Sequence, residues 1–272
     1  MSMISIEAIQ SFIRFCDDTN RMGWHERNGG NLSYRMSKNE SEQCRPFFYR
    51  EPGAWTACEV EVKNLAGCFI LVTGSGKYFK NVMEKPEENI CIAEIDDKGT
   101  SYRIVWGLSK GGTPTSEFPC HLLNHSVKKE VTGQDQGVVY HAHPVNTIAL
   151  TFVLPLTPRD FSRALWKCMT ECTIIFPSGV GVLPWMVPGG PEIALASAEQ
   201  MKDYDAIIWA HHGIFGSGPD FDSVFGLLHI IEKSAEIYLK ASALGIKQSI
   251  SDEELRDIAK AYKLSINEQF LE

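Results

Sequence analysis

Three histidines are the residues whose types and spacing best suit metal chemistry. His141 and His143 end the apolar run 138–140, which has the composition of a strand. Side chains alternate between the two faces of a strand, so these two imidazoles project from one face at neighbouring heights. His212 follows a second strand-like run, residues 206–210, far along the chain. Two ligands at one strand end and a distant third are typical of a catalytic zinc site, which keeps one coordination position open.

The other histidines have a simpler interpretation. A histidine beside an apolar strand is usually a packed core residue, and this alternative also applies to the His-x-His pair taken alone. His211 adjoins His212, and in an extended chain the two point to opposite faces, so only one of them is expected to bind the metal. The histidines without a partner pattern, to which we assign structural roles, are His25, His121, His125 and His229.

Two glycine-rich segments could bind a phosphate group. Residues 73–77 read Thr-Gly-Ser-Gly-Lys and residues 28–31 read Asn-Gly-Gly-Asn. Glycine lets the backbone turn sharply and aim its N–H groups at an anion, although such segments are often only turns. The spacing is not that of a Walker A loop, so ATP is not indicated. Ser116, at a predicted helix start, would add a hydroxyl and the helix dipole.

Two carboxylates are candidates for proton transfer. Glu117 follows Thr115 and Ser116, and the three could simply cap the next helix. Beside a metal-bound ketone, however, Glu117 would be a general base for the acidic C–H bond. Glu171 precedes residues 173–176, which we predict to be a strand, and by itself it is interpreted as a surface carboxylate.

Composition favours one soluble domain. The 272 residues include 44% hydrophobic residues and no linker or repeat, so we predict a single domain, residues 1–272. The net charge of −8 argues against nucleic acid or an anionic membrane as partner, but not against a small phosphorylated substrate. No apolar run approaches the roughly 20 residues that span a bilayer, and the start lacks the features of a signal peptide.

The cysteines point to a reducing compartment. None of the eight forms a Cys-x-x-Cys pair, and several lie in apolar runs, as small buried residues do. We therefore expect a cytoplasmic protein.

The coarse pattern predicts a mainly antiparallel sheet with helices packed on it. Residues 90–95 and 102–106 flank a turn and indicate a hairpin, while residues 5–22 have helical spacing with Ser5 as a possible cap. The last third is strongly helical. Residues 38–61 are polar and are interpreted as an irregular surface excursion.

Five motifs together resemble the class II aldolase/adducin family, over nearly the whole chain. They are residues 24–31, 72–77, 114–117, 141–143 and 212–213. Residues 183–189 and 212–218 are similar to a narrower group of aldolases within it. The match is weakest over residues 38–61.

The resemblance implies an α/β fold: three layers, α/β/α, around a mostly antiparallel sheet. It also implies a homotetramer with active sites at subunit interfaces, and Zn²⁺ on the three histidines. Glu117 would be the base, and Glu171 would reach the neighbouring subunit's site. His211 stands where an aromatic residue is expected, behind the metal site. The residues that would hold or support the phosphate are Asn28, Gly30, Asn31, Ser75, Gly76 and Ser116.

The implied reaction is cleavage of a carbon–carbon bond in a phosphorylated ketose. Two alternatives remain open. Other enzymes of this fold, such as epimerases and dehydratases of sugar phosphates, share the metal site and differ in the pocket behind it. Adducin-like domains instead keep the fold as a binding module, which the complete set of histidines and Glu117 disfavours.

Overall fold

A single mixed sheet forms the centre of the protein in the computed structural model, which describes residues 2–272. Its nine described strands lie in the order β2-β5-β4-β3-β1-β6-β9-β8-β7. Among these described strands only β7 and β8 pair in parallel, so the predicted mostly antiparallel α/β fold is confirmed. The strands are β1 (Asn31–Arg35), β2 (Thr56–Ala57), β3 (Phe69–Thr73), β4 (Ile90–Ile95), β5 (Ser101–Gly107), β6 (Gly137–Ala142), β7 (Gly181–Leu183), β8 (Ala206–Trp209) and β9 (Gly213–Gly218).

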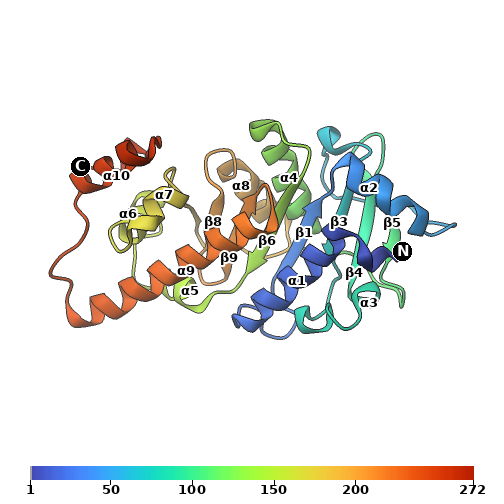
Figure 1. Ribbon diagram of the computed structural model, residues 1–272, viewed down its shortest axis with the longest axis horizontal. Coiled ribbons are helices and arrows are strands. Elements are labelled where there is room, and N and C mark those ends of the chain that lie inside the picture. The colour runs from blue at the N-terminus through green and yellow to red at the C-terminus, as the bar shows by residue number, and fades with distance from the viewer. Residues whose placement is uncertain (1) are drawn as a thin grey trace.

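Helices cover both faces of this sheet. The α-helices are α1 (Glu7–Arg21), α2 (Lys38–Cys44), α3 (Pro86–Asn89), α4 (Phe118–Thr132), α5 (Val145–Leu150), α6 (Pro158–Trp166), α7 (Thr170–Ile175), α8 (Pro191–Gln200), α9 (Phe221–Leu244) and α10 (Asp252–Tyr262). Helices α1 and α9 contact each other, and α9 packs on β6 and β9, whereas α4 packs on α8 and β6. Helices α6, α7 and α10 gather at the end of the molecule that holds the C-terminus (Figure 1).

The alternation of strand side chains divides the core into two layers. On β3, Phe69 and Leu71 join the α1 and α9 core, while Ile70 and Val72 join the core on the α4 face. On β6, Tyr140 faces α1 and α9, so His141, one residue along, faces α4. The period of two therefore puts polar strand residues beside the start of α4.

Three local predictions were wrong. Residues 38–61 are not irregular throughout, because Ser37 and Glu40 form a capping box that starts α2, and β2 follows later. Residues 173–176 are not a strand but lie in and after α7, which packs on α6, α9 and α10. Burial of Cys172 and Thr173 among helices outweighs the strand propensity of so short a run. Ser5 does not cap α1, whose N-cap position is held by Ile6.

The described residues include no helix that is long and apolar enough to cross a membrane.

Candidate active site

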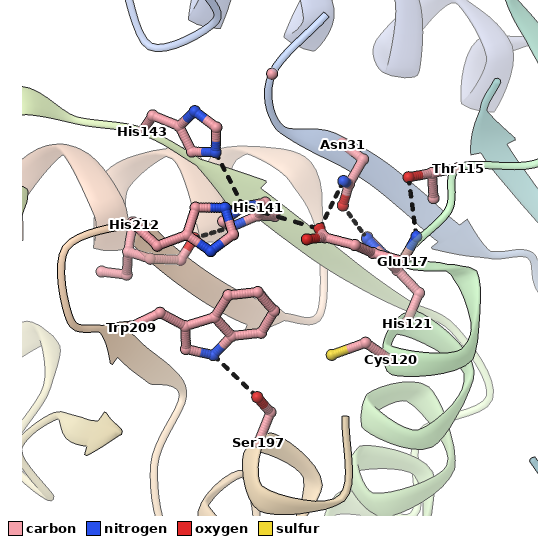
Figure 2. Close-up of polar contacts among 12 residues, drawn as sticks. Asn31, Thr115, Glu117, Cys120, His121, His141, His143, Ser197, Trp209 and His212 are labelled. Carbon is pink, nitrogen blue, oxygen red and sulfur yellow. Dashed lines mark hydrogen bonds and ion pairs between the residues drawn. The ribbon is translucent and has the colours of Figure 1, made fainter. Parts of the chain in front are cut away.

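Three imidazoles converge at the end of β6. The Nε2 atom of His141 lies 3.1 Å from that of His143 and 3.4 Å from that of His212. Two ligand nitrogens on one tetrahedral zinc ion, each about 2.0–2.1 Å from the metal, lie about 3.3 Å apart. The three histidines that the sequence indicates are therefore brought together at the spacing of a metal site (Figure 2).

The Nδ1 atoms of His141 and His143 lie on the side of each ring away from the cluster, and their hydrogen-bond partners fix the tautomer of each neutral ring. His141 Nδ1 lies 3.0 Å from the carbonyl oxygen of Ile214, and His143 Nδ1 lies 2.6 Å from a carboxylate oxygen of Glu26. Both partners are acceptors, so in the neutral form of each ring Nδ1 carries the proton and Nε2 presents a lone pair. Two lone pairs facing each other across 3.1 Å repel unless a cation lies between them. The donor set thus fits a divalent metal ion.

Burial keeps the rings of His141 and His212 in the neutral form that binds metals. It lowers the pKa of His212 to about 4, and the neighbouring His143 lowers it further. Burial likewise holds the pKa of His141 well below its ordinary value. Because ligand histidines must be unprotonated, the site is prepared for a cation at neutral pH.

The structure distinguishes His212 from His211. His211 points away from the cluster: its Nδ1 lies 3.1 Å from Thr151 Oγ1, and its ring packs against Phe152. Its backbone has a φ of 60°, so the chain turns sharply between β8 and β9. His212 reaches the cluster from that turn, and its buried Nδ1 has no hydrogen-bond partner within the described residues.

Glu117 lies beside the histidines at the start of α4. Its Oε2 is 3.8 Å from His141 Nε2 and accepts a 2.7 Å hydrogen bond from Asn31 Nδ2 (Figure 2). Burial raises the pKa of Glu117 to about 7, although the hydrogen bond from Asn31 acts to lower it. A carboxyl group with this pKa can both accept and return a proton near neutral pH.

One cavity of about 230 Å³ unites these groups with the two glycine-rich loops. Its wall includes every residue that the sequence analysis proposed for the site except Glu171. The lining residues are Asn28, Gly29, Gly30, Asn31, Gly74, Ser75, Gly76, Thr115, Ser116, Glu117, His141, His143, Pro188, Gly189 and His212.

Glycine is required where backbone meets the histidines. A Cβ atom on Gly213 would lie 2.3 Å from the carbonyl oxygen of Ala142. A Cβ atom on Gly30, whose φ is +71°, would lie 2.5 Å from His25 Nδ1. Gly76 differs, since a Cβ atom there would meet nothing within 4 Å, and its φ of +69° is what calls for glycine.

His25 holds the first glycine loop in place. Its Nδ1 lies 2.9 Å from the carbonyl oxygen of Gly29, its Nε2 lies 2.7 Å from the hydroxyl of Tyr140, and its ring stacks on Phe79. Burial lowers the pKa of His25 to about 4, so the ring is neutral. These contacts agree with the structural role assigned to it.

Sequence reasoning missed Glu26 and placed Glu171 before a strand, where the structure has helix α7. Glu26 orients His143 and adjoins the glycine loop, so its place beside residues 28–31 was the available signal. Glu171 is exposed in the first turn of α7 and does not line the cavity of its own chain.

The fold and the site define a known class. Residues 10–239 match the family described as the class II aldolase and adducin N-terminal domain, and the chain belongs to this family. Rhamnulose-1-phosphate aldolase from Mannheimia succiniciproducens is 42% identical over 255 residues, covering 93% of each chain. Rhamnulose-1-phosphate aldolase from Yersinia pestis is 42% identical over 265 residues, covering 97% of this chain and 96% of the relative. The chain is accordingly an enzyme of the carbon–carbon lyase class.

Solved structures show the same fold. A sugar-phosphate aldolase from Thermotoga maritima superposes with a TM-score of 0.73 at 27% identity, covering 88% of this chain and 96% of the other. An L-fuculose-1-phosphate aldolase from Thermus thermophilus gives a TM-score of 0.54 at 21% identity, covering 86% and 94%. At that identity the second likeness concerns the fold alone.

Proposed function

We propose that the protein cleaves L-rhamnulose 1-phosphate reversibly into dihydroxyacetone phosphate and L-lactaldehyde, as a step of L-rhamnose catabolism. The observation that carries the proposal is the cavity in which three converging imidazoles and Glu117 face two glycine-rich loops. The near-full-length relatives named rhamnulose-1-phosphate aldolase supply the substrate.

Zinc is the proposed metal, held by His141, His143 and His212. Support comes from the spacing of the three Nε2 atoms and from an all-imidazole donor set, which suits zinc, although other divalent ions also accept imidazole. When bound, the ion would polarise the ketone and stabilise the negative charge that develops on breaking the C3–C4 bond. Glu26 would keep the His143 ring in the ligating orientation.

The loops are proposed to bind the phosphate. Asn28, Ser75 and Ser116 would donate from their side chains, and the backbone N–H groups of Gly30 and Gly76 would complete the site. All five line the same cavity as the histidines. Ser116 lies just ahead of α4, where the helix dipole favours an anion.

Glu117 is proposed to handle the proton at C3. In the cleavage direction it delivers this proton to the carbon that has lost its bond to C4, and dihydroxyacetone phosphate leaves. In the synthetic direction the ionised carboxylate removes the same proton. A pKa near 7 suits both directions, since the protonated and ionised forms are then both populated.

Glu171 is proposed to act in the active site of a neighbouring subunit within a homotetramer. There it would help to remove the proton from the C4 hydroxyl as the aldehyde forms. Three large apolar side chains are exposed between the end of β6 and the end of α7: Val145 at the start of α5, Phe152, which is 70% exposed, and Ile175 on α7. Exposed apolar side chains that form one contiguous patch are characteristic of protein–protein contacts, and the proposed tetramer requires these residues to be covered by a neighbouring subunit.

We further propose a single domain, residues 1–272, in the cytoplasm. One hydrophobic cluster joins residues from Met3 to Leu271, so both ends of the chain share a core. All eight cysteines are free, as in a reducing compartment.

Release of dihydroxyacetone phosphate, followed through a coupled reductase, tests the function. We expect rapid release from L-rhamnulose 1-phosphate that a chelator abolishes and zinc restores. L-Fuculose 1-phosphate should be a poor substrate. No release by the folded, zinc-loaded protein would discard the assignment and direct attention to other sugar phosphates.

A further inference from the structure

A buried polar seam runs behind Glu117, between β1 and α4. Asn31, Ser33 and Arg35 lie at alternate positions of β1 and face α4, while the intervening Leu32 and Tyr34 join the opposite core. Two residues of strand rise about 6.6 Å. Four residues of helix rise about 6 Å, which is nearly the same distance. Side chains four residues apart on α4 can therefore each lie opposite every second residue of β1. Those helix residues are Glu117, His121 and His125.

Hydrogen bonds connect the members of this seam in one continuous row. His125 Nε2 lies 2.8 Å from Ser33 Oγ, which lies 2.6 Å from His121 Nδ1. His121 Nε2 contacts Asn31 Oδ1, and Asn31 Nδ2 lies 2.7 Å from Glu117 Oε2. The two histidines and Ser33 are at most 1% exposed, and Figure 2 shows Asn31 between Glu117 and His121.

The donors of this row point in one direction. A carboxylate only accepts, so the amide of Asn31 turns its NH₂ group to Glu117 and its oxygen to His121. His121 must then carry its proton on Nε2 and accept at Nδ1, where the Ser33 hydroxyl donates. The oxygen of that hydroxyl in turn accepts from His125 Nε2–H. Each neutral ring has one N–H group: that of His121 donates to Asn31 Oδ1, and that of His125 donates to Ser33 Oγ.

Burial maintains this arrangement. It lowers the pKa of His121 to about 3 and holds that of His125 well below its ordinary value, so both rings are neutral. Reversing the Asn31 amide would set its oxygen against the Glu117 carboxylate and its NH₂ group against a ring N–H. Both contacts are unfavourable between buried groups, so the amide has one stable orientation.

We propose that His121 is a positioning residue for Glu117, acting through Asn31, and that Ser33 sets the tautomer of His121 that makes this possible. The assignment rests on the proposed function only in that Glu117 moves the proton there. With one oxygen held by Asn31, the Glu117 carboxylate keeps a fixed direction toward the cavity. Misplacing a reacting group by about 1 Å can cost about 100-fold in rate.

Two substitutions of His121 separate positioning from packing. In His121→Gln the side-chain NH₂ group occupies the place of Nε2 and still donates to Asn31. In His121→Asn the amide reaches only the place of Nδ1, so it keeps the contact with Ser33 and loses the donor to Asn31. Both variants are made in the full chain, loaded with zinc, and compared for kcat, KM and metal content with L-rhamnulose 1-phosphate.

We expect His121→Asn to lower kcat about 10- to 100-fold with KM and metal content within about twofold, while His121→Gln stays within about threefold of the parent. In a Glu117→Gln background, His121→Asn should cause no further loss, because its effect passes through Glu117. Equal losses in the two variants, a loss that persists in Glu117→Gln, or a fully active His121→Asn would overturn the proposal.

Two further measurements cover a variant that does not fold and a parent protein that does not cleave the substrate. If His121→Asn does not fold, Ser33→Ala takes its place, with the same expected loss of kcat and the same Glu117→Gln background. If the parent does not cleave the substrate, the proposed function fails, and crystal structures of the variants decide the positioning role separately. The Glu117 carboxylate should then be displaced in His121→Asn and not in His121→Gln; an unmoved carboxylate in both would refute the role.

Discussion

The Nε2 atoms of His141 and His143 face each other across 3.1 Å, and in the neutral form of the two rings neither of these atoms carries a proton. Their protons are committed on the other side of each ring, to the carbonyl oxygen of Ile214 and to Glu26. A contact that is repulsive in the empty protein becomes two coordination bonds when a cation is present. Metal binding should therefore stabilise the fold as well as supply chemistry.

The choice between two adjacent histidines gives the first prediction. His212→Ala should lose stoichiometric zinc and nearly all turnover, because one of three converging nitrogens is removed. His211→Phe should keep both, since His211 contacts Thr151 and Phe152 instead of the cluster. Metal analysis after gel filtration, with turnover, checks both variants. The reverse pattern would show that the ligand assignment is wrong.

Glu26 should set metal affinity without being a ligand. Glu26→Ala removes the acceptor for His143 Nδ1–H, and we expect zinc affinity to fall about 10- to 100-fold. Glu26→Gln retains an acceptor oxygen at the same place and should lose less. Competition with a fluorescent zinc chelator measures both constants. Unchanged affinity in Glu26→Ala would exclude the orienting role.

Glu117 should be essential for turnover but not for metal retention. Glu117→Gln keeps the size of the side chain and removes its basicity, so turnover should fall about 10²- to 10⁴-fold. Its zinc content should match that of the parent. Exchange of the C3 proton of dihydroxyacetone phosphate with solvent isolates this step, and near-normal exchange would assign the proton transfer to another group.

The same carboxyl group makes the metal-free protein less stable at higher pH. Its pKa rises on folding, from about 4.5 to about 7, so the folded state binds the proton more tightly. The contribution of Glu117 to the free energy of unfolding therefore falls as pH rises from about 4.5 to about 7 and then stays level, for a total of about 3 kcal/mol. Glutamine does not titrate, so the free energy of unfolding of Glu117→Gln, relative to that of the parent protein, should grow by roughly 2 kcal/mol between pH 5 and pH 8. Urea denaturation with chelator present measures it, and a pH-independent difference would contradict the buried, protonated carboxyl group.

Mixed oligomers test whether Glu171 serves a neighbouring site. Glu171→Ala and His212→Ala should each be inactive, yet dissociating and reassembling them together should restore part of the activity. Some cavities would then combine an intact His212 with Glu171 of a neighbour. As a matched control, mixing His212→Ala with Glu117→Ala should restore nothing, since every cavity would lack one of its own residues. Equal recovery in the two mixtures would count against a shared site.

Much of the site follows from local pattern. The period of two along an extended segment puts the imidazoles of His141 and His143 on one face, and the glycines of the loop 73–77 permit a sharp turn. The same kind of reasoning correctly located the hairpin of β4 and β5 and the start of α4 after Glu117. It failed for residues 173–176, because a short apolar run is compatible with a helix or a strand until its neighbours are known.

The sequence by itself determined which residue types are available and which of them share a face of one element. Only the tertiary structure decided which distant groups meet: Glu26 orients His143, and α4 lies against β1 so that His121 reaches Ser33. The physical reason is that a hydrogen bond or a metal site joins atoms within a few ångströms. Asn31 and His121 are 90 residues apart in the sequence, and they come into hydrogen-bond contact because the whole core packs. Local periodicity does not encode such a contact.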